Sequence, residues 1–323
     1  MRALLLMVLY VALHCASSDS DQENIETLMD QVLVLRVPHG PGTRFDVPLI
    51  CGDAYENQPV FWKKNGKEPR PALQGNQVSV LVEEMDGGNY TCHLSPGGEY
   101  LNHTLILVQL DPDNMTVILE EKDPGAGHIH CSGFNYNGSF HCGWTRTASR
   151  SQATVLLVRA ERNSQETTCE LDADGSGVHC EDISCPFNEE QHRISLTVYI
   201  HSDSRLEAYT KAFYLREIVR PEPLPNLRYS DGALFSWDYP DSWEKPCRFF
   251  DLQFQVMVVH HEVTCDTKDP DHIVMSDNTE KTNYAVNVKH KRFIFCVRAQ
   301  DKYTKGPWSD WSFYTVKKHK MHH

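Results

Sequence analysis

Two cysteines and one tryptophan near the N-terminus constrain the fold more than any other residues. Cys51 is followed by Trp62, and Cys92 comes two positions after Tyr90. A Cys51–Cys92 disulfide would join two β-sheets, with Trp62 packed on the sulfur atoms and the Tyr90 hydroxyl bonded back to the nearby chain. Closing a loop of this length would stabilise the fold by roughly 3–4 kcal/mol. The pattern therefore predicts a β-sandwich at the start of the chain.

This spacing is typical of an immunoglobulin-like domain, which we assign to residues 19–110. Residues 78–82 and 104–108 are rich in β-branched and apolar side chains and are predicted strands.

Residues 1–18 have the features of a signal peptide. Arg2 provides a positive charge, residues 3–13 are apolar, and residues 16–18 are small. The apolar run is too short to cross a bilayer, and no later stretch approaches the ~20 apolar residues needed. We expect a secreted, extracellular protein with no membrane anchor.

The cysteine count also fits secretion. Ten of the 11 cysteines remain once Cys15 is removed with the signal peptide, and an oxidising compartment favours their pairing. Four Asn-x-Ser/Thr sequons point the same way and make these residues candidate glycosylation sites: Asn89, Asn102, Asn114 and Asn137.

Charge and motifs exclude several function classes. The formal net charge of -13 argues against a nucleic-acid partner, which needs a clustered basic surface. The chain has no His-Glu-x-x-His, Gly-x-Ser-x-Gly or Gly-rich phosphate loop, so we predict no enzyme, no catalytic residue and no cofactor. Histidines at 128/130 and 260/261 offer two ligands each, too few to predict a metal site.

The rest of the chain divides at two proline-containing boundaries. Asp111-Pro112-Asp113 separates residues 19–110 from a second β-rich segment, 111–220. A stiff linker at residues 221–225 opens a third, 221–317, and residues 318–323 are expected to be a disordered tail. The predicted strands are 115–119, 154–159, 194–200 and 209–215 in the second segment, and 233–239, 250–259, 284–288 and 292–299 in the third.

A Trp-Ser repeat, Trp308-Ser309-Asp310-Trp311-Ser312, lies in what we interpret as the last strand. With a period of two, Trp308, Asp310 and Ser312 would share one face, and Ser309 and Trp311 the other. In the preceding strand Phe293, Phe295 and Val297 would face the core, which turns Cys296 and Arg298 outward.

The repeat resembles the WSxWS box of class I cytokine receptors, which ends a fibronectin type III domain. In that family, arginine and tryptophan side chains alternate in a ladder on the sheet, and the resemblance places Arg298 in it. A guanidinium on an indole contributes roughly 0.5–2 kcal/mol. The resemblance thus gives the box a structural role.

The second segment resembles the upper domain of the same receptors. Cys131, Cys142 and Trp144 follow the Cys-x10-Cys-x-Trp signature, and Cys169 with Cys180 suits the second bridge of that domain. Cys185 is left over. It either pairs with another chain or bonds inside the domain. The expected fold class is all-β, an immunoglobulin-like sandwich followed by two fibronectin type III domains.

The three segments together resemble the interleukin-12 beta-subunit family, with this chain as a divergent vertebrate member. Local matches lie at residues 88–92, 135–140, 237–243 and 297–301. The resemblance implies a secreted receptor-like subunit that holds a four-helix alpha subunit at the elbow of the second and third domains and presents it to cell-surface receptors.

The same resemblance assigns residues to the partner interface. Cys185 matches the cysteine that bonds to the alpha subunit, and Glu189 and Asp301 match acidic positions that meet a basic partner residue. Tyr303 and Phe249 match aromatic interface positions, and Phe249 stands where the family has tyrosine.

The third domain departs from the family in its cysteines. We hypothesise a Cys265–Cys296 bridge with Cys247 free, which would also allow homodimers. The alternative function is a soluble cytokine alpha-receptor or decoy, with the same fold and reversible binding.

Overall fold

The computed structural model describes residues 24–37, 43–110, 116–184, 187, 189–230, 233–243, 250–289 and 292–317. Several predictions lie outside them: the signal peptide, the tail, Asn114, Cys185, Cys247 and Phe249. The chain forms two compact units. The first comprises Met1–His128, Thr145–Leu157 and Val198–Tyr209, and the second comprises Ile129–Trp144, Val158–Thr197 and Thr210–His323.

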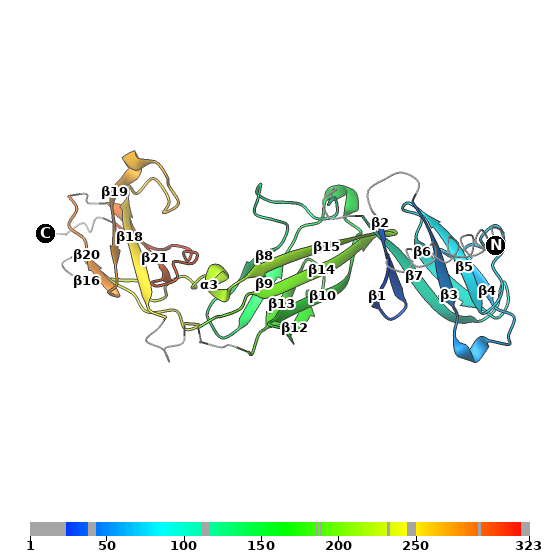
Figure 1. The fold of residues 1–323 in the computed structure, drawn as a ribbon. Helices are drawn as coiled ribbons and strands as arrows, with labels where there is room; N and C mark the ends of the chain where they lie inside the picture. The colour runs from blue at the N-terminus through cyan, green and yellow to red at the C-terminus, as the bar shows by residue number, and fades with distance from the viewer. Residues whose placement is uncertain are drawn as a thin grey trace, which may run out of the picture. The chain divides into compact units, whose positions relative to one another are not determined.

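Strands are the main regular elements of the first unit. They are β1 (Ile25–Met29), β2 (Val32–Val37), β3 (Arg44–Ile50), β4 (Phe61–Lys64), β5 (Gln77–Glu83), β6 (Gly88–His93) and β7 (Tyr100–Leu110), with 3-10 turns at Asp53–Tyr55 and Ala148–Arg150. One sheet runs β4-β6-β7-β2-β1, and β3 pairs with β5 separately (Figure 1). Strands β10 (Thr154–Arg162), β14 (Ile194–Ser202) and β15 (Arg205–Phe213) contribute residues to both units.

Alternation builds the first core. In β3, Phe45, Val47 and Leu49 are buried while their neighbours are exposed, as a half-buried strand requires. Cys51 and Cys92 are bonded, and Trp62 lies in the same buried cluster. The all-β prediction is confirmed here.

Tyr90 is also part of this core and is 3% exposed. The Lys64 amine lies 5.5 Å from the centroid of the Tyr90 ring. Burial raises the pKa of the Tyr90 phenol, and the nearby Lys64 opposes that shift. The expected hydroxyl bond to the nearby chain stays a prediction.

The predicted strand at 115–119 is wrong for its described residues. Leu119 forms only an isolated bridge, with Arg146. The backbone N–H groups of Val117 and Ile118 instead donate to the Glu207 carboxylate at 2.9–3.1 Å, and that of Leu119 donates to the Tyr209 hydroxyl at 2.9 Å. Side chains therefore satisfy the donors that a strand ladder would use.

The second unit begins with a four-stranded sheet in the order β12-β13-β9-β8. Its strands are β8 (His130–Ser132), β9 (Ser139–Gly143), β12 (Thr168–Leu171) and β13 (Gly177–Glu181), and β11 (Gln165–Glu166) pairs with β10. Cys131 stands opposite Cys142 and Cys169 opposite Cys180, and both pairs are bonded.

The predicted strand at 209–215 ends early. β15 stops at Phe213, and the short helix α3 (Leu215–Ile218) follows. The Glu190 carboxylate accepts from the N–H groups of Leu215 at 2.7 Å and Arg216 at 3.1 Å, so an acidic side chain caps this turn.

The C-terminal part of this unit has two sheets. One is β16 (Arg228–Ser230), β17 (Leu234–Ser236) and β20 (Asn283–Ala285), and the other is β19 (Ile273–Thr279), β18 (Leu252–Val259), β21 (Phe293–Asp301) and β22 (Ser312–Val316), with a 3-10 turn at Pro270–His272. Phe235 stacks on Phe295 with ring centroids 3.9 Å apart, which joins the two sheets.

Cys265 and Cys296 are bonded. The expectation that Cys296 turns outward needs correction, because it is fully buried in a second cluster with Met257 and Val259. The Cys265 loop covers this face of the sheet, so both faces of β21 are shielded there.

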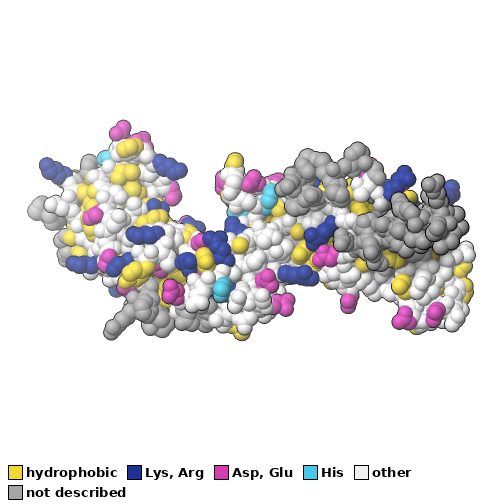
Figure 2. All heavy atoms as spheres, viewed as in Figure 1, with side chains coloured by type: hydrophobic (Ala, Val, Ile, Leu, Met, Phe, Trp, Pro, Cys, Tyr) yellow, Lys and Arg dark blue, Asp and Glu magenta, His cyan; other side chains and the backbone are white. Residues whose placement is uncertain are grey.

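Within the described residues, no helix is long and apolar enough to cross a membrane. On the face drawn in Figure 2, acidic and basic side chains are interspersed. This mixture is unlike the concentrated basic stripe that nucleic-acid binding requires.

Candidate functional site

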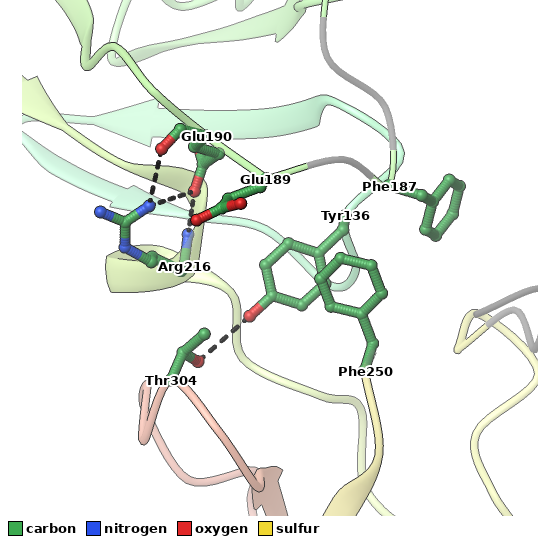
Figure 3. A pocket seen from close by; sticks show the side chains of 7 residues that line it. All are labelled: Tyr136, Phe187, Glu189, Glu190, Arg216, Phe250 and Thr304. Atoms are coloured by element: carbon green, nitrogen blue, oxygen red, sulfur yellow. Dashed lines mark hydrogen bonds and ion pairs between the residues drawn. The ribbon is translucent and has the colours of Figure 1, made fainter. Parts of the chain in front are cut away.

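A cavity of about 400 Å³ lies within the second unit (Figure 3). It is formed by the β8–β9 loop, the segment before β14, the start of α3, the residue leading to β18 and the loop after β21. The lining residues are Tyr136, Phe187, Glu189, Glu190, Arg216, Phe250 and Thr304. Three aromatic rings and two carboxylates therefore line one cavity.

Tyr136 is the centre of the aromatic wall. Its ring stacks on Phe250 with centroids 4.2 Å apart and meets Trp243 edge-on at 5.8 Å. Its hydroxyl donates to Asp301 Oδ2 at 3.2 Å and lies 3.2 Å from Thr304 Oγ1. Burial is the main cause that raises the pKa of the Tyr136 phenol, so it remains a neutral donor.

The β8–β9 loop that carries Tyr136 is fixed by local chemistry. Asn135 and Asn137 accept backbone N–H bonds two residues ahead, which is the Asx-turn pattern. Gly138 has φ 102°, and a Cβ there would lie 2.0 Å from Asp182 O. Only glycine allows this approach. The loop is therefore held against the segment leading to Phe187.

Asp301 contacts two of the cavity residues, Tyr136 and Thr304, and is 1% exposed. Its Oδ1 accepts from the N–H groups of Tyr303 at 2.7 Å and Thr304 at 2.6 Å, and its Oδ2 accepts from Tyr136. Both carboxylate oxygens are thus engaged in holding the loop after β21.

A buried ion cluster supports the acidic wall. The Arg162 side chain is 5% exposed and lies 2.6 Å from Asp182 Oδ2 and 3.0 Å from Glu190 Oε1. Arg216 donates to the Glu190 carbonyl at 3.2 Å, and its guanidinium stacks 3.7 Å from the Tyr214 ring. Glu190 is therefore buried against two arginines, and its neighbour Glu189 is exposed at the cavity.

The structure brings some of the predicted interface residues together. Glu189 lines the cavity, and Asp301 is hydrogen-bonded to the cavity residues Tyr136 and Thr304. Tyr303 is 57% exposed on the turn that also carries Thr304. Phe249 immediately precedes the cavity residue Phe250, but Phe249 and Cys185 lie outside the described residues.

Sequence reasoning missed most of the aromatic wall. Tyr136 lies in the 135–140 segment noted for its resemblance, but no role was assigned to it, and Phe187, Phe250, Arg216 and Thr304 were not singled out. Isolated aromatic and polar loop residues carry no periodic signal that could have identified them.

The Trp-Ser box differs from the prediction in its backbone. Residues 308–311 lie outside the sheet and form no regular element, and β22 begins only at Ser312. The predicted strict alternation is therefore wrong, and both indoles meet one guanidinium. Arg298 lies 5.0 Å from the Trp308 ring and 4.3 Å from the Trp311 ring, and burial lowers the pKa of its guanidinium.

The box also fastens the proline linker. Ser309 and Ala299 are joined by two hydrogen bonds. The Ser309 N–H donates to the Ala299 carbonyl at 2.7 Å, and the Ala299 N–H donates to Ser309 Oγ at 2.9 Å. Arg220 donates to the Trp308 carbonyl at 2.9 Å and pairs with Asp310. Ser312 Oγ donates to the Leu224 carbonyl at 2.8 Å.

The described sequons differ in their surroundings. Asn89 and Asn137 are exposed. Asn102 is partly buried, and its Nδ2 donates to the Cys51 carbonyl at 2.8 Å. A glycan on Asn102 would attach to this same nitrogen, at a partly buried position beside the core disulfide.

Comparisons with known proteins agree with this architecture. A family model described as "Cytokine interleukin-12p40 C-terminus" matches residues 126–202. Interleukin-12 subunit beta of Papio anubis is 31% identical over 299 residues, which cover 85% of this chain and 87% of that protein. The proteins of the same name from Macaca mulatta and Homo sapiens are 31% and 30% identical, with the same coverage. The chain belongs to the interleukin-12 subunit beta family of cytokine chains.

Proposed function

We propose that this chain is the receptor-like subunit of a secreted heterodimeric cytokine and holds a four-helix alpha subunit at the cavity around Tyr136. The observation that carries the proposal is the aromatic cavity of about 400 Å³ with a carboxylate at its edge. The complex would then be presented to cell-surface receptors.

The chemistry of the lining indicates what the partner inserts. Tyr136, Phe187 and Phe250 offer ring faces, and Glu189 offers a negative charge at the edge. A partner arginine would bury its apolar stem and planar head among the rings and pair with the carboxylate. Such an aromatic site around one charge pair is typical of an interface hot spot.

Asp301 has a different part in this proposal from Glu189. Its buried carboxylate positions Tyr136 and the turn that presents Tyr303, so it acts through them. Cys185 would add a disulfide to the alpha subunit, next to the cavity segment 187–190.

The test is co-expression with candidate helical alpha subunits, followed by capture and mass analysis. Glu189→Lys should weaken noncovalent capture by about 30-fold or more, the effect of losing ~2 kcal/mol at a hot spot. Glu262→Lys is the matched control, since Glu262 is also exposed but lies past the opposite end of β18. Unchanged capture by the Glu189→Lys protein would contradict the proposal.

A non-reducing gel distinguishes the alternative. A covalent heterodimer that Cys185→Ser abolishes supports the cytokine-subunit function. Reversible capture of a free cytokine, with no covalent species in the native protein, would favour a soluble alpha-receptor or decoy.

A further inference from the structure

Two histidines and an aspartate gather on the β12-β13-β9-β8 sheet, and none of them lines the cavity. His141 on β9 and His179 on β13 are directly opposite each other in the strand register, so they project from the same face. Asp172 follows β12 at the start of the hairpin and reaches over both rings.

The potential ligand atoms of the three side chains already lie close enough together for one ion to contact them all. His141 Nε2 is 2.9 Å from Asp172 Oδ2, and His179 Nε2 is 3.8 Å from Asp172 Oδ1. One ligand atom from each residue lies within 4.8 Å of the others. Ligands on a tetrahedral zinc ion, with bonds of about 2.0–2.1 Å, stand about 3.3 Å apart, so only small side-chain rotations are needed.

The backbone around the trio is fixed. Disulfides tie β12 to β13 through Cys169–Cys180 and β8 to β9 through Cys131–Cys142, and each histidine neighbours one of these cysteines. The two imidazole centroids are consequently held 4.5 Å apart. A site held this way loses little conformational entropy when an ion binds.

Gly177 leaves open the space between the ligand atoms. A Cβ at this position would lie 2.5 Å from Asp172 Oδ2 and 2.6 Å from His141 Nε2. Any larger residue would occupy the point where the aspartate and the histidine converge. The site is also accessible, because the His179 side chain is 73% exposed and that of His141 is 37% exposed.

We propose that His141, Asp172 and His179 form a binding site for a divalent transition-metal ion of the zinc class. Two imidazoles and one carboxylate are a standard ligand set for zinc and leave a fourth position for water. The bound ion would connect the β12–β13 hairpin to β9. The inference is independent of the proposed cytokine interface.

The test is zinc binding to chelator-treated protein, measured by calorimetry and by metal analysis after dialysis. His319, His322 and His323 at the C-terminus could bind zinc themselves. The parent protein is therefore the full chain with these three residues changed to asparagine. We expect one zinc per chain, a rise in Tm with added zinc, and visible bands of tetrahedral geometry with cobalt.

His179→Asn is the most informative variant, because that side chain is largely exposed and its loss should leave the fold intact. Changing a residue that only supports a metal ligand already weakens metal binding by about 10–100-fold, so the loss of the ligand His179 should weaken zinc binding by at least that much. Gly177→Ala should also weaken binding by filling the site.

The matched control is His272→Asn. His272 lies 3.7 Å from Asp269 and faces His260, but those rings are 6.2 Å apart. This control should bind zinc as the parent does. The proposal is overturned if the parent binds no zinc, or if His179→Asn binds as tightly as the parent.

Discussion

The Tyr136 hydroxyl donates to Asp301 Oδ2 at 3.2 Å, across a sequence separation of 165 residues. This bond joins the β8–β9 loop to the end of β21, and the cavity lies beside it. Because both residues are almost fully buried, water cannot take the place of a lost hydrogen-bond partner, and removing one partner leaves the other unsatisfied.

Removing that hydroxyl should destabilise the second unit without opening its aromatic wall. Tyr136→Phe keeps the stacking on Phe250 but leaves a buried acceptor short of one donor, at a cost of about 1–3 kcal/mol. The measurement is the free energy of unfolding in urea, followed by tryptophan fluorescence. Tyr303→Phe, at a 57% exposed ring, should change stability by less than about 0.5 kcal/mol. Equal effects from the two variants would contradict this account.

Alkaline pH should weaken the same unit. Burial raises the pKa of Tyr136 above that of an unfolded tyrosine, about 10. The stabilisation is thus complete below pH 10 and is lost as the pH rises from 10 toward the folded pKa, by up to about 1.4 kcal/mol per pH unit. Burial also raises the pKa values of Tyr90 and Tyr209, so the wild type must be compared with Tyr136→Phe. The free energy of unfolding of Tyr136→Phe should fall less steeply between pH 9 and 11 than that of the wild type. Parallel pH curves for the two proteins would contradict the role given to Tyr136.

Arg298 should contribute to stability through the two indoles. Arg298→Ala loses both ring contacts, each contributing about 0.5–2 kcal/mol, together with its bond to Gln255 at 2.8 Å. Arg298→Lys should restore only part, since an ammonium cannot stack as a planar guanidinium does. Differential scanning calorimetry would record the shift in Tm. Arg292→Ala serves as the control, because Arg292 is exposed and immediately precedes β21, and it should leave Tm nearly unchanged.

The buried Arg162 should be far more sensitive than an exposed arginine. Arg162→Met leaves the carboxylates of Asp182 and Glu190 buried without this cation, a loss of about 3–5 kcal/mol. Arg193→Met removes an exposed pair with Glu217, a hydrogen bond to the Ala212 carbonyl at 3.0 Å and a contact with the Tyr214 ring, and it should still cost much less because these groups are reached by water. Secretion yield and thermal unfolding of the two variants would reveal the difference. An effect of Arg162→Met no larger than that of Arg193→Met would contradict this account.

Glycosylation should follow side-chain exposure. We expect glycans at Asn89 and Asn137 but none at Asn102, whose Nδ2 is bonded to the Cys51 carbonyl. Mass analysis of single Asn→Gln variants tests each site. Asn137→Gln should remove one glycan mass and Asn102→Gln none, so a glycan found on Asn102 would refute the assignment.

Local patterns predicted the elements whose residues pack on their own neighbours. The alternation of β5 and β18 and the spacing of Cys51, Trp62 and Cys92 are direct consequences of strand geometry. The pattern failed where side chains replaced backbone partners. The Glu207 carboxylate accepts hydrogen bonds from the backbone N–H groups of residues 117–118, where a strand was predicted. The Glu190 carboxylate accepts from the N–H of Leu215, and helix α3 begins there instead of a continued strand.

The candidate site was predicted only in outline. Resemblance directed attention to Glu189, Asp301 and Tyr303, but it could not distinguish an exposed carboxylate from a buried one. That difference depends on Tyr136 and the N–H groups of the 303–304 turn, which converge on Asp301 from distant parts of the chain.

The sequence by itself determined an all-β chain with paired cysteines and a Trp-Ser box, because strand period and cysteine spacing are local properties. Only the tertiary structure decided that Trp308 and Trp311 share Arg298, that Tyr136 meets Asp301 beside an aromatic cavity, and that His141, His179 and Asp172 converge. Each of these depends on strand register and loop closure, which bring together residues that no local pattern connects.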